Sequence, residues 1–251
     1  MGRIPTGRIF ERLEVLYAQR EIEAAERHLC YWLAEAKAEG DLAGEYQMHN
    51  ELMGHYRKNG RREEAIEHAN AALSLLSPLG ISDSVSGGVA RLNAATVYKA
   101  FSMPEQSIVL FEKAKELLER LLPPDDPQLA GLYNNMGLCL VDLGRFAEAR
   151  SLYEKAIAIM QKQPNGKPDV AITYLNLANL EEAERGLEES EGIIARLLDL
   201  AWENLTAPEN KQDGYLAFVL EKCAPTFGYY GRFADEADLK QKSGELYGKG
   251  T

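Results

Sequence analysis

Hydrophobic positions along the chain recur with the spacing of amphipathic helices rather than with the alternation of strands. The clearest segment runs from Asn134 to Ile157. In its second half Ala149, Tyr153 and Ala156 stand at i, i+4 and i+7, which places them on one face of a helix. A short turn at residues 143–145 precedes that face. The segment therefore predicts two helices joined as a hairpin.

The same hairpin recurs about every 42 residues. A small residue begins the second-helix stripe of each copy, and the set is Ala25, Ala65, Ser107, Ala149 and Ser190, with Ala237 as a poorer sixth member. The apolar stripe of the first helices consists of Leu52, Met53, Tyr56, Ala94, Ala95, Tyr98, Met136, Gly137, Leu140, Leu177 and Ala178. One hairpin alone cannot bury its apolar face, so consecutive copies are expected to stack and share a core.

These repeats predict an all-α protein, an α-solenoid of about six stacked antiparallel helical hairpins. Segments rich in Pro and Gly mark the ends of the second helices. No segment is polar and long enough to serve as a linker, so we expect a single domain over residues 8–248. The approximate repeats are residues 8–40, 45–78, 87–122, 129–163, 170–206 and 215–248.

The repeated residues resemble the tetratricopeptide repeat (TPR) family. The family pattern is followed by Tyr133, Met136, Gly137, Leu140, Gly144, Phe146, Ala149, Tyr153 and Ala156. The long period and the segment 168–180 (PDVAITYLNLANL) are similar to kinesin light chain. The resemblance weakens at both ends, since Leu13 stands at a small-residue position and Pro225 interrupts a predicted first helix. It implies a right-handed superhelix whose first helices line a concave, peptide-binding face.

Asparagines recur on the predicted first helices and are the main candidates for binding. Asn93, Asn135 and Asn176 share one repeat position, and related long-repeat proteins carry a similar ladder there. In the second copy Glu51 takes that position, with Asn50 beside it. We include the neighbouring Asn134 and Asn179 among the candidates. An amide side chain both donates and accepts, so it suits a peptide backbone. Alternatively, each Asn bonds to its own hairpin or to the next one.

Charge on the same helices predicts a polar groove. Arg57, Lys58 and Lys99 project toward the concave side in the second and third copies. Asp142 and Glu182 take the corresponding places in the fourth and fifth. Such a gradient would fix the direction of a bound peptide and favour an acidic segment in it. The other interpretation is that these charges are solvated helix ends.

Composition excludes several classes of function. The net charge of −11 argues against nucleic-acid and anionic-membrane partners. Three distant cysteines, one of them Cys139 in a predicted core helix, favour a reducing, cytoplasmic setting. Four histidines (His28, His49, His55 and His68) lack metal-ligand spacing, and no catalytic or phosphate-binding motif occurs. We therefore expect no enzyme activity, no metal and no cofactor. Tyr229 and Tyr230 are interpreted as packing residues of the last repeat.

The predicted function is a non-enzymatic protein–protein interaction module that holds a peptide or a partner protein in its groove. Two alternatives stay open. One is a peptide-sensing regulatory protein whose superhelix changes curvature on binding. The other is a self-assembling scaffold, and the sequence leaves the oligomeric state open.

Overall fold

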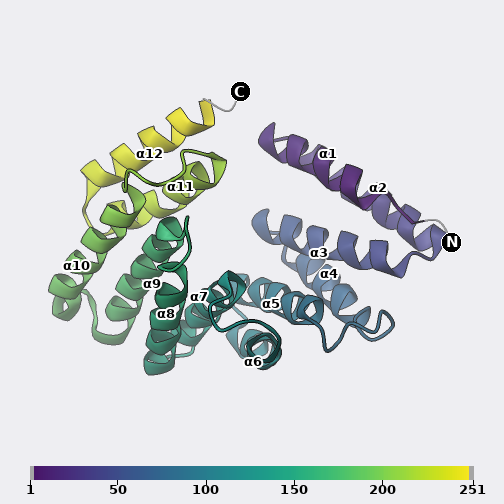
Figure 1. Cartoon of the computed structure of the whole chain (residues 1–251), viewed down its shortest axis with the longest axis horizontal. Helices are drawn as coiled ribbons and strands as arrows, with labels where there is room; N and C mark the ends of the chain where they lie inside the picture. The colour runs from purple at the N-terminus through teal and green to yellow at the C-terminus, as the bar shows by residue number, and fades with distance from the viewer. Residues whose placement is uncertain (1–2, 249–251) are drawn as a thin grey trace. The chain divides into compact units, whose positions relative to one another are not determined.

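A computed structural model describes residues 3–248 and contains twelve α-helices and no strand within that range (Figure 1). The all-α prediction is confirmed. The helices are α1 (Thr6–Ala18), α2 (Ile22–Glu39), α3 (Leu42–Lys58), α4 (Arg62–Ser74), α5 (Val85–Ala100), α6 (Pro104–Leu121), α7 (Pro127–Asp142), α8 (Phe146–Met160), α9 (Lys167–Arg185), α10 (Leu187–Leu205), α11 (Gly214–Tyr229) and α12 (Phe233–Gly248). None of these helices combines the length and the apolar composition needed to cross a membrane.

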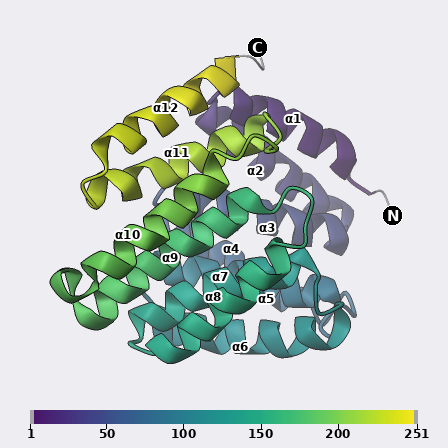
Figure 2. The same ribbon diagram turned by 60° about the vertical axis from the view of Figure 1, so that its left-hand side comes forward.

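Consecutive helices pair as antiparallel hairpins, and the chain divides into two compact units of three hairpins each. Unit 1 ends at Leu122 and unit 2 begins at Pro123. Inside unit 1, α2 packs on α3 and α4 on α5, while inside unit 2, α8 packs on α9. First helices also touch, α3 with α5 and α9 with both α7 and α11 (Figures 1 and 2). A single domain spanning both units stays a prediction.

A residue with a positive φ reverses the chain in every hairpin. The set is Arg20, Gly60, Ser102, Gly144, Gly186 and Gly231. Five of the turns have three residues, whereas Gly186 alone joins α9 to α10. Its φ of 84° and ψ of 160° lie in a region that essentially only glycine adopts, because a side chain would clash there. The fifth hairpin is therefore tighter than the others.

The repeated small residues lie where the paired helices approach each other. Five of the predicted positions, Ala25, Ala65, Ser107, Ala149 and Ser190, are fully buried. Gly137 shows why size matters there, because a Cβ added to it would lie 2.4 Å from the ring of Tyr153. Tyr153 is itself fully buried. Gly137 therefore allows α7 and α8 to approach closely in the fourth hairpin.

The sixth copy follows a different register from the predicted one. Ala237 is exposed, so its assignment as the sixth small packing residue is wrong. The buried side chains of α12 are Leu239, Ser243 and Leu246. In the first four hairpins the small packing residue stands five positions after the turn residue with positive φ. Five positions after Gly231 stands the half-buried Glu236, so the turn at Gly231 sets a different register. Sequence spacing misplaced the stripe by one residue because no small residue occurs at the true position.

The predicted interruption at Pro225 is also wrong. Helix α11 continues through Pro225 to Tyr229. Proline removes one backbone hydrogen bond and crowds the preceding turn. Here its ring lies on the exposed side, while Val219, Leu220 and Phe227 are fully buried on the other. Packing of that apolar face against the second helix outweighs the local preference of proline to end a helix.

Candidate functional site

About half of the predicted site lies on unit 1, on a surface formed by α3 and α5. This α3–α5 surface is defined by Asn50, Arg57, Lys58, Asn93 and Lys99. Arg57 is half-buried, and no acidic side chain pairs with it in the described part of the chain. Burial lowers the pKa of its guanidinium. A partly desolvated cation without a counter-ion is costly, so an incoming carboxylate would gain more there than at an ordinary surface arginine.

The neighbouring charges on α3 are arranged differently. Lys58 is exposed, and its ammonium lies 5.8 Å from the ring centroid of Tyr17. Glu51 is half-buried, and burial raises the pKa of its carboxyl while the charge of Lys58 opposes the rise. Lys99 on α5 is half-buried. The surface is therefore cationic near Arg57 and Lys58, with one partly buried acid beside them.

The two asparagines of this surface differ in their bonding. The Asn50 amide donates to the carbonyl of Tyr46, one turn earlier in α3, at 2.9 Å. Asn93 on α5 is exposed, and its side chain makes no hydrogen bond to any of the residues 3–248. Asn50 is partly committed to its own helix, whereas Asn93 is open to a ligand.

In unit 2 the predicted asparagines bond within and between hairpins. Asn134 on α7 donates to the hydroxyl of the buried Thr173 on α9 at 2.8 Å. Its carbonyl oxygen accepts from the Asn176 amide at 3.3 Å. Asn135 donates to the Gly131 carbonyl of its own helix at 2.8 Å. Asn134 and Asn176 thus join neighbouring repeats, which is the alternative role that the sequence left open.

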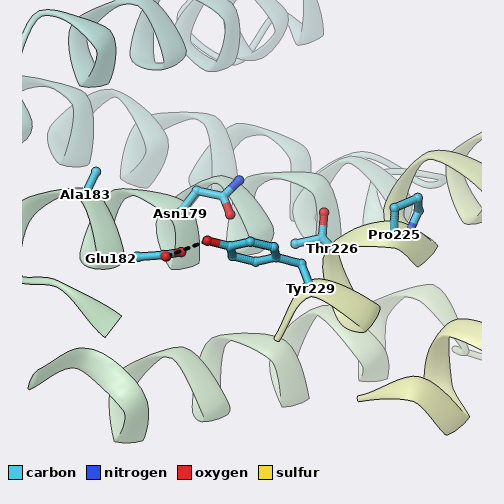
Figure 3. A pocket seen from close by; sticks show the side chains of 6 residues that line it. All are labelled: Asn179, Glu182, Ala183, Pro225, Thr226 and Tyr229. Atoms are coloured by element: carbon cyan, nitrogen blue, oxygen red, sulfur yellow. Dashed lines mark hydrogen bonds between the residues drawn. The ribbon is translucent and has the colours of Figure 1, made fainter. Parts of the chain in front are cut away.

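The α9–α11 hollow is an open depression of about 780 Å³ lined by Asn179, Glu182, Ala183, Pro225, Thr226 and Tyr229 (Figure 3). The Tyr229 hydroxyl donates to one carboxylate oxygen of Glu182 at 2.7 Å. Tyr230 donates to the other at 2.8 Å, and its oxygen lies 3.0 Å from the Asn179 carbonyl oxygen. The NH₂ group of Asn179 makes no hydrogen bond among the described residues. It remains a donor for a ligand in this hollow.

The predicted acidic end of the groove is weaker than the charge pattern indicated. Glu182 is half-buried and already accepts two tyrosine hydroxyls, so its capacity to bind a cation is reduced. Asp142 is exposed at the end of α7. A basic surface in unit 1 has the clearer structural support.

Sequence reasoning missed an exposed aromatic stripe along α11. Tyr215, Phe218 and Tyr229 are exposed by 48%, 45% and 68%, and Pro225 lies between them on the same exposed side. Their spacing of three, seven and four residues was the available signal. The packing interpretation of the tyrosine pair fits Tyr230, which is half-buried, but is wrong for Tyr229. Two members of this stripe, Pro225 and Tyr229, line the α9–α11 hollow.

Histidine and tyrosine rings cluster around α3 in unit 1, both within the second hairpin and toward the first. The Nδ1 atoms of His49 and His68 lie 2.7 Å apart, so one ring donates to the other. The Tyr17 hydroxyl and His55 Nδ1 are 3.0 Å apart. Burial, aided by neighbouring positive charge, lowers the pKa of His49 to about 4. Burial also lowers the pKa of His55 and His68. These neutral rings act as packing groups at neutral pH.

The described residues form neither a metal-binding cluster nor a reactive thiol site. No group of three or more His, Cys, Asp or Glu side chains there could hold a metal ion. The three cysteines are free thiols, and Cys139 and Cys223 are buried. Burial raises the pKa of Cys223 to about 12, which keeps it a protonated, unreactive thiol.

Comparison with known proteins agrees with this architecture. A family model for the tetratricopeptide repeat matches residues 128–201. Kinesin light chain-related 1 from Arabidopsis thaliana is 26% identical over 147 residues, which cover 55% of this chain and 24% of that protein. The chain thus matches about a quarter of that relative's length.

Two solved structures share the fold. BtubC (BKLC) from P. vanneervenii superposes with a TM-score of 0.66 at 22% identity, over 78% of this chain and 79% of the other. A Rap protein complexed with competence and sporulation factor superposes with a TM-score of 0.55 at 14% identity, over 96% and 74%. Residues 128–201 therefore match the tetratricopeptide repeat, and the chain shares the helical-repeat fold of these solved structures.

Proposed function

We propose that this chain is a non-enzymatic binding module that holds an extended peptide, or an extended segment of a partner protein, on its first helices. Tetratricopeptide repeats generally mediate protein–protein interactions, and the Rap protein of similar fold was solved in complex with a factor. Three free thiols fit a reducing, cytoplasmic setting. The proposal goes further and assigns the contacts to particular side chains.

The proposal rests chiefly on the environment of Arg57. Its guanidinium is half-buried, lies on a first helix and has no acidic partner among residues 3–248. A guanidinium accepts a carboxylate in a two-pronged geometry, so the fitting ligand has an Asp or Glu at this point. Lys58 and Lys99 extend the positive charge on the same surface. The predicted acidic segment would bind there.

The asparagines supply contacts that do not depend on ligand sequence. Asn93 and the NH₂ group of Asn179 have no partner in the described structure, and Asn50 and Asn135 keep a carbonyl oxygen that no hydrogen bond occupies. Asn176 bonds Asn134 at 3.3 Å, a long bond that a peptide carbonyl can replace. We propose that these amides pair with the backbone of the ligand.

A peptide-display selection on the full chain tests the proposal. We expect enrichment of sequences with Asp or Glu. For a selected peptide, Arg57→Gln is expected to weaken binding about tenfold. Asn93→Ala with Asn179→Ala should weaken it further. The matched control is Lys113→Gln, an exposed lysine on the second helix α6.

Equal affinity in all variants would remove the first helices as the binding surface, provided that circular dichroism shows equal helix content. The two alternatives give other signals. A regulatory sensor changes its radius of gyration in X-ray scattering when the selected peptide binds. A self-assembling scaffold shows a mass in light scattering that rises with concentration.

A further inference from the structure

A second cleft adjoins the α9–α11 hollow at Tyr229 and lies between α10 and the turn that joins α11 to α12. It encloses about 510 Å³ and is lined by Leu187, Glu188, Glu191, Ile194, Ala195, Leu198, Tyr229, Tyr230 and Arg232. All of these residues belong to unit 2. Its volume matches one or two large side chains rather than a folded domain.

The floor and walls of this α10 cleft are apolar. Ile194 and Leu198 form the floor and are 3% and 2% exposed. Leu187 and Tyr229 rise beside them and are 52% and 68% exposed. Covering such exposed apolar groups with another apolar side chain lowers the free energy of the system by about 25 cal/mol per Å² of apolar surface buried.

The rim of the cleft leaves negative charge without a partner. Glu188 and Glu191 are exposed and form no ion pair with any residue of the described range. The one cation at the cleft, Arg232, is already paired with Asp199 and Asp235. Incoming cations therefore meet two free carboxylates, while incoming anions meet a neutralised guanidinium.

Two irregularities of the repeat coincide at this cleft. The one-residue turn at Gly186 starts α10 directly after α9, so no turn residues cover Leu187. The next turn glycine, Gly231, lies 45 residues later, whereas Gly144 and Gly186 are 42 apart. The sixth hairpin is thus out of the regular period where it borders α10. A hollow of about 490 Å³ lies at a similar place of the repeat in unit 1, between α4 and the α5–α6 hairpin, so these two departures distinguish the α10 cleft from a regular counterpart.

We propose that the α10 cleft is a docking site for a basic, apolar segment of a partner protein, with a Leu- or Phe-like side chain in the cleft and Lys or Arg on either side. Charge complementarity selects this occupant. Unit 2 carries 13 Lys and Arg against 21 Asp and Glu, a net charge of −8. Repulsion between two such surfaces disfavours a second copy of the chain. The site is independent of the first-helix contacts proposed above.

Fluorescence anisotropy with three labelled hexapeptide amides on the full chain tests this. The sequences are Lys-Arg-Leu-Phe-Arg-Lys, the same core flanked by acids, Glu-Asp-Leu-Phe-Asp-Glu, and a basic peptide without apolar residues, Lys-Arg-Gly-Ser-Arg-Lys. We expect the first to bind more tightly than the other two. Added salt should weaken it, since the rim charges are exposed.

Variants then locate the binding. Ala195→Trp fills the cleft from an exposed position and is expected to weaken the first peptide at least about tenfold. Glu188→Gln with Glu191→Gln should weaken it about three- to tenfold. The matched controls are Ala147→Trp and Glu189→Gln, which change exposed residues outside the cleft and should leave affinity unchanged.

Equal binding of the two basic peptides, or wild-type affinity in Ala195→Trp, would overturn the proposal. It would also fail if light scattering showed a dimer that Ala195→Trp dissociates, because the occupant would then be a second copy. Arg57→Gln separates this site from the proposed function, since it should leave binding of the first peptide intact.

Discussion

The two units contain the same number of hairpins but join them with different chemistry. In unit 1, neutral rings cluster around α3. Tyr17 meets His55 between the first two hairpins, and His49 meets His68 within the second. In unit 2, carboxylates, amides and tyrosine hydroxyls join the hairpins, as in Arg150 with Glu181 and Tyr230 with Glu182. One repeat architecture therefore tolerates quite different polar groups between its copies.

Charge separates the units further. Unit 1 has 15 Lys and Arg against 18 Asp and Glu, a net charge of −3, and unit 2 has a net charge of −8. Each unit also contains one tryptophan, Trp32 in unit 1 and Trp202 in unit 2. Variants that keep only one of them report on one unit at a time by fluorescence.

The largest effect is expected from emptying the core of either unit. Phe111 in unit 1 and Phe227 in unit 2 are both fully buried. Phe111→Ala and Phe227→Ala should each lower the free energy of unfolding by about 3–5 kcal/mol, because a cavity replaces the ring. Urea unfolding followed at Trp32 and at Trp202 measures it. A single domain predicts that each variant shifts both signals, and a shift of only the local signal would contradict that prediction.

Acid should destabilise unit 1 before unit 2. His49 is 4% exposed and its folded pKa is lowered to about 4, although Glu45 lies 3.6 Å away. The unfolded chain takes up the proton near its ordinary value, so stability is full above about pH 6.5 and falls as pH drops toward 4. The loss is on the order of 3 kcal/mol.

Urea midpoints at Trp32 between pH 7.5 and 4.5 measure this loss, with Trp202 as the internal reference. In His49→Gln the difference in pH dependence between the two signals should shrink. An unchanged difference would show that His49 is not its source.

Removing the ion pair between the fourth and fifth hairpins should cost less than the core changes. Glu181 is 4% exposed and pairs with Arg150, which is itself partly exposed. Arg150→Ala leaves the carboxylate buried with only the longer contact to Arg185, so we expect a loss of about 2 kcal/mol at Trp202. In unit 1, Arg61→Ala removes a solvent-exposed pair with Glu26 and should have a smaller effect at Trp32. Equal losses of stability in the two variants would contradict the expected difference between the two ion pairs.

The smallest expected change concerns the tyrosine bonds to Glu182. Tyr230→Phe keeps the ring and removes the hydroxyl that donates to Glu182, so it should cost about 1 kcal/mol. Thermal unfolding by circular dichroism measures it, and Tyr31→Phe, an exposed tyrosine of unit 1, is the control. A loss of stability no larger than that of the control would show that this hydrogen bond stabilises the folded chain no more than a bond to water does.

The candidate site was only partly predictable. Asn50, Asn93, Asn135 and Asn176 were found because one repeat position carries the same side chain in several copies. The α11 stripe and the α10 cleft were missed because neither is marked by one residue type that recurs at the same position of several copies. Which of their side chains stay exposed depends on how the neighbouring hairpin packs.

The sequence by itself determined the helices and their pairing. Small residues recur near a fixed period and lie where the two helices of a hairpin come into contact; they are Ala25, Ala65, Ser107, Ala149 and Ser190. Only the tertiary structure decided how the polar groups are used. Asn134 and Asn176 bond each other while Asn93 stays open, and Pro225 remains helical. Apolar burial follows local periodicity. The polar partner of Asn134 lies 42 positions away in the neighbouring repeat, and the helix through Pro225 is held by packing against the paired helix α12.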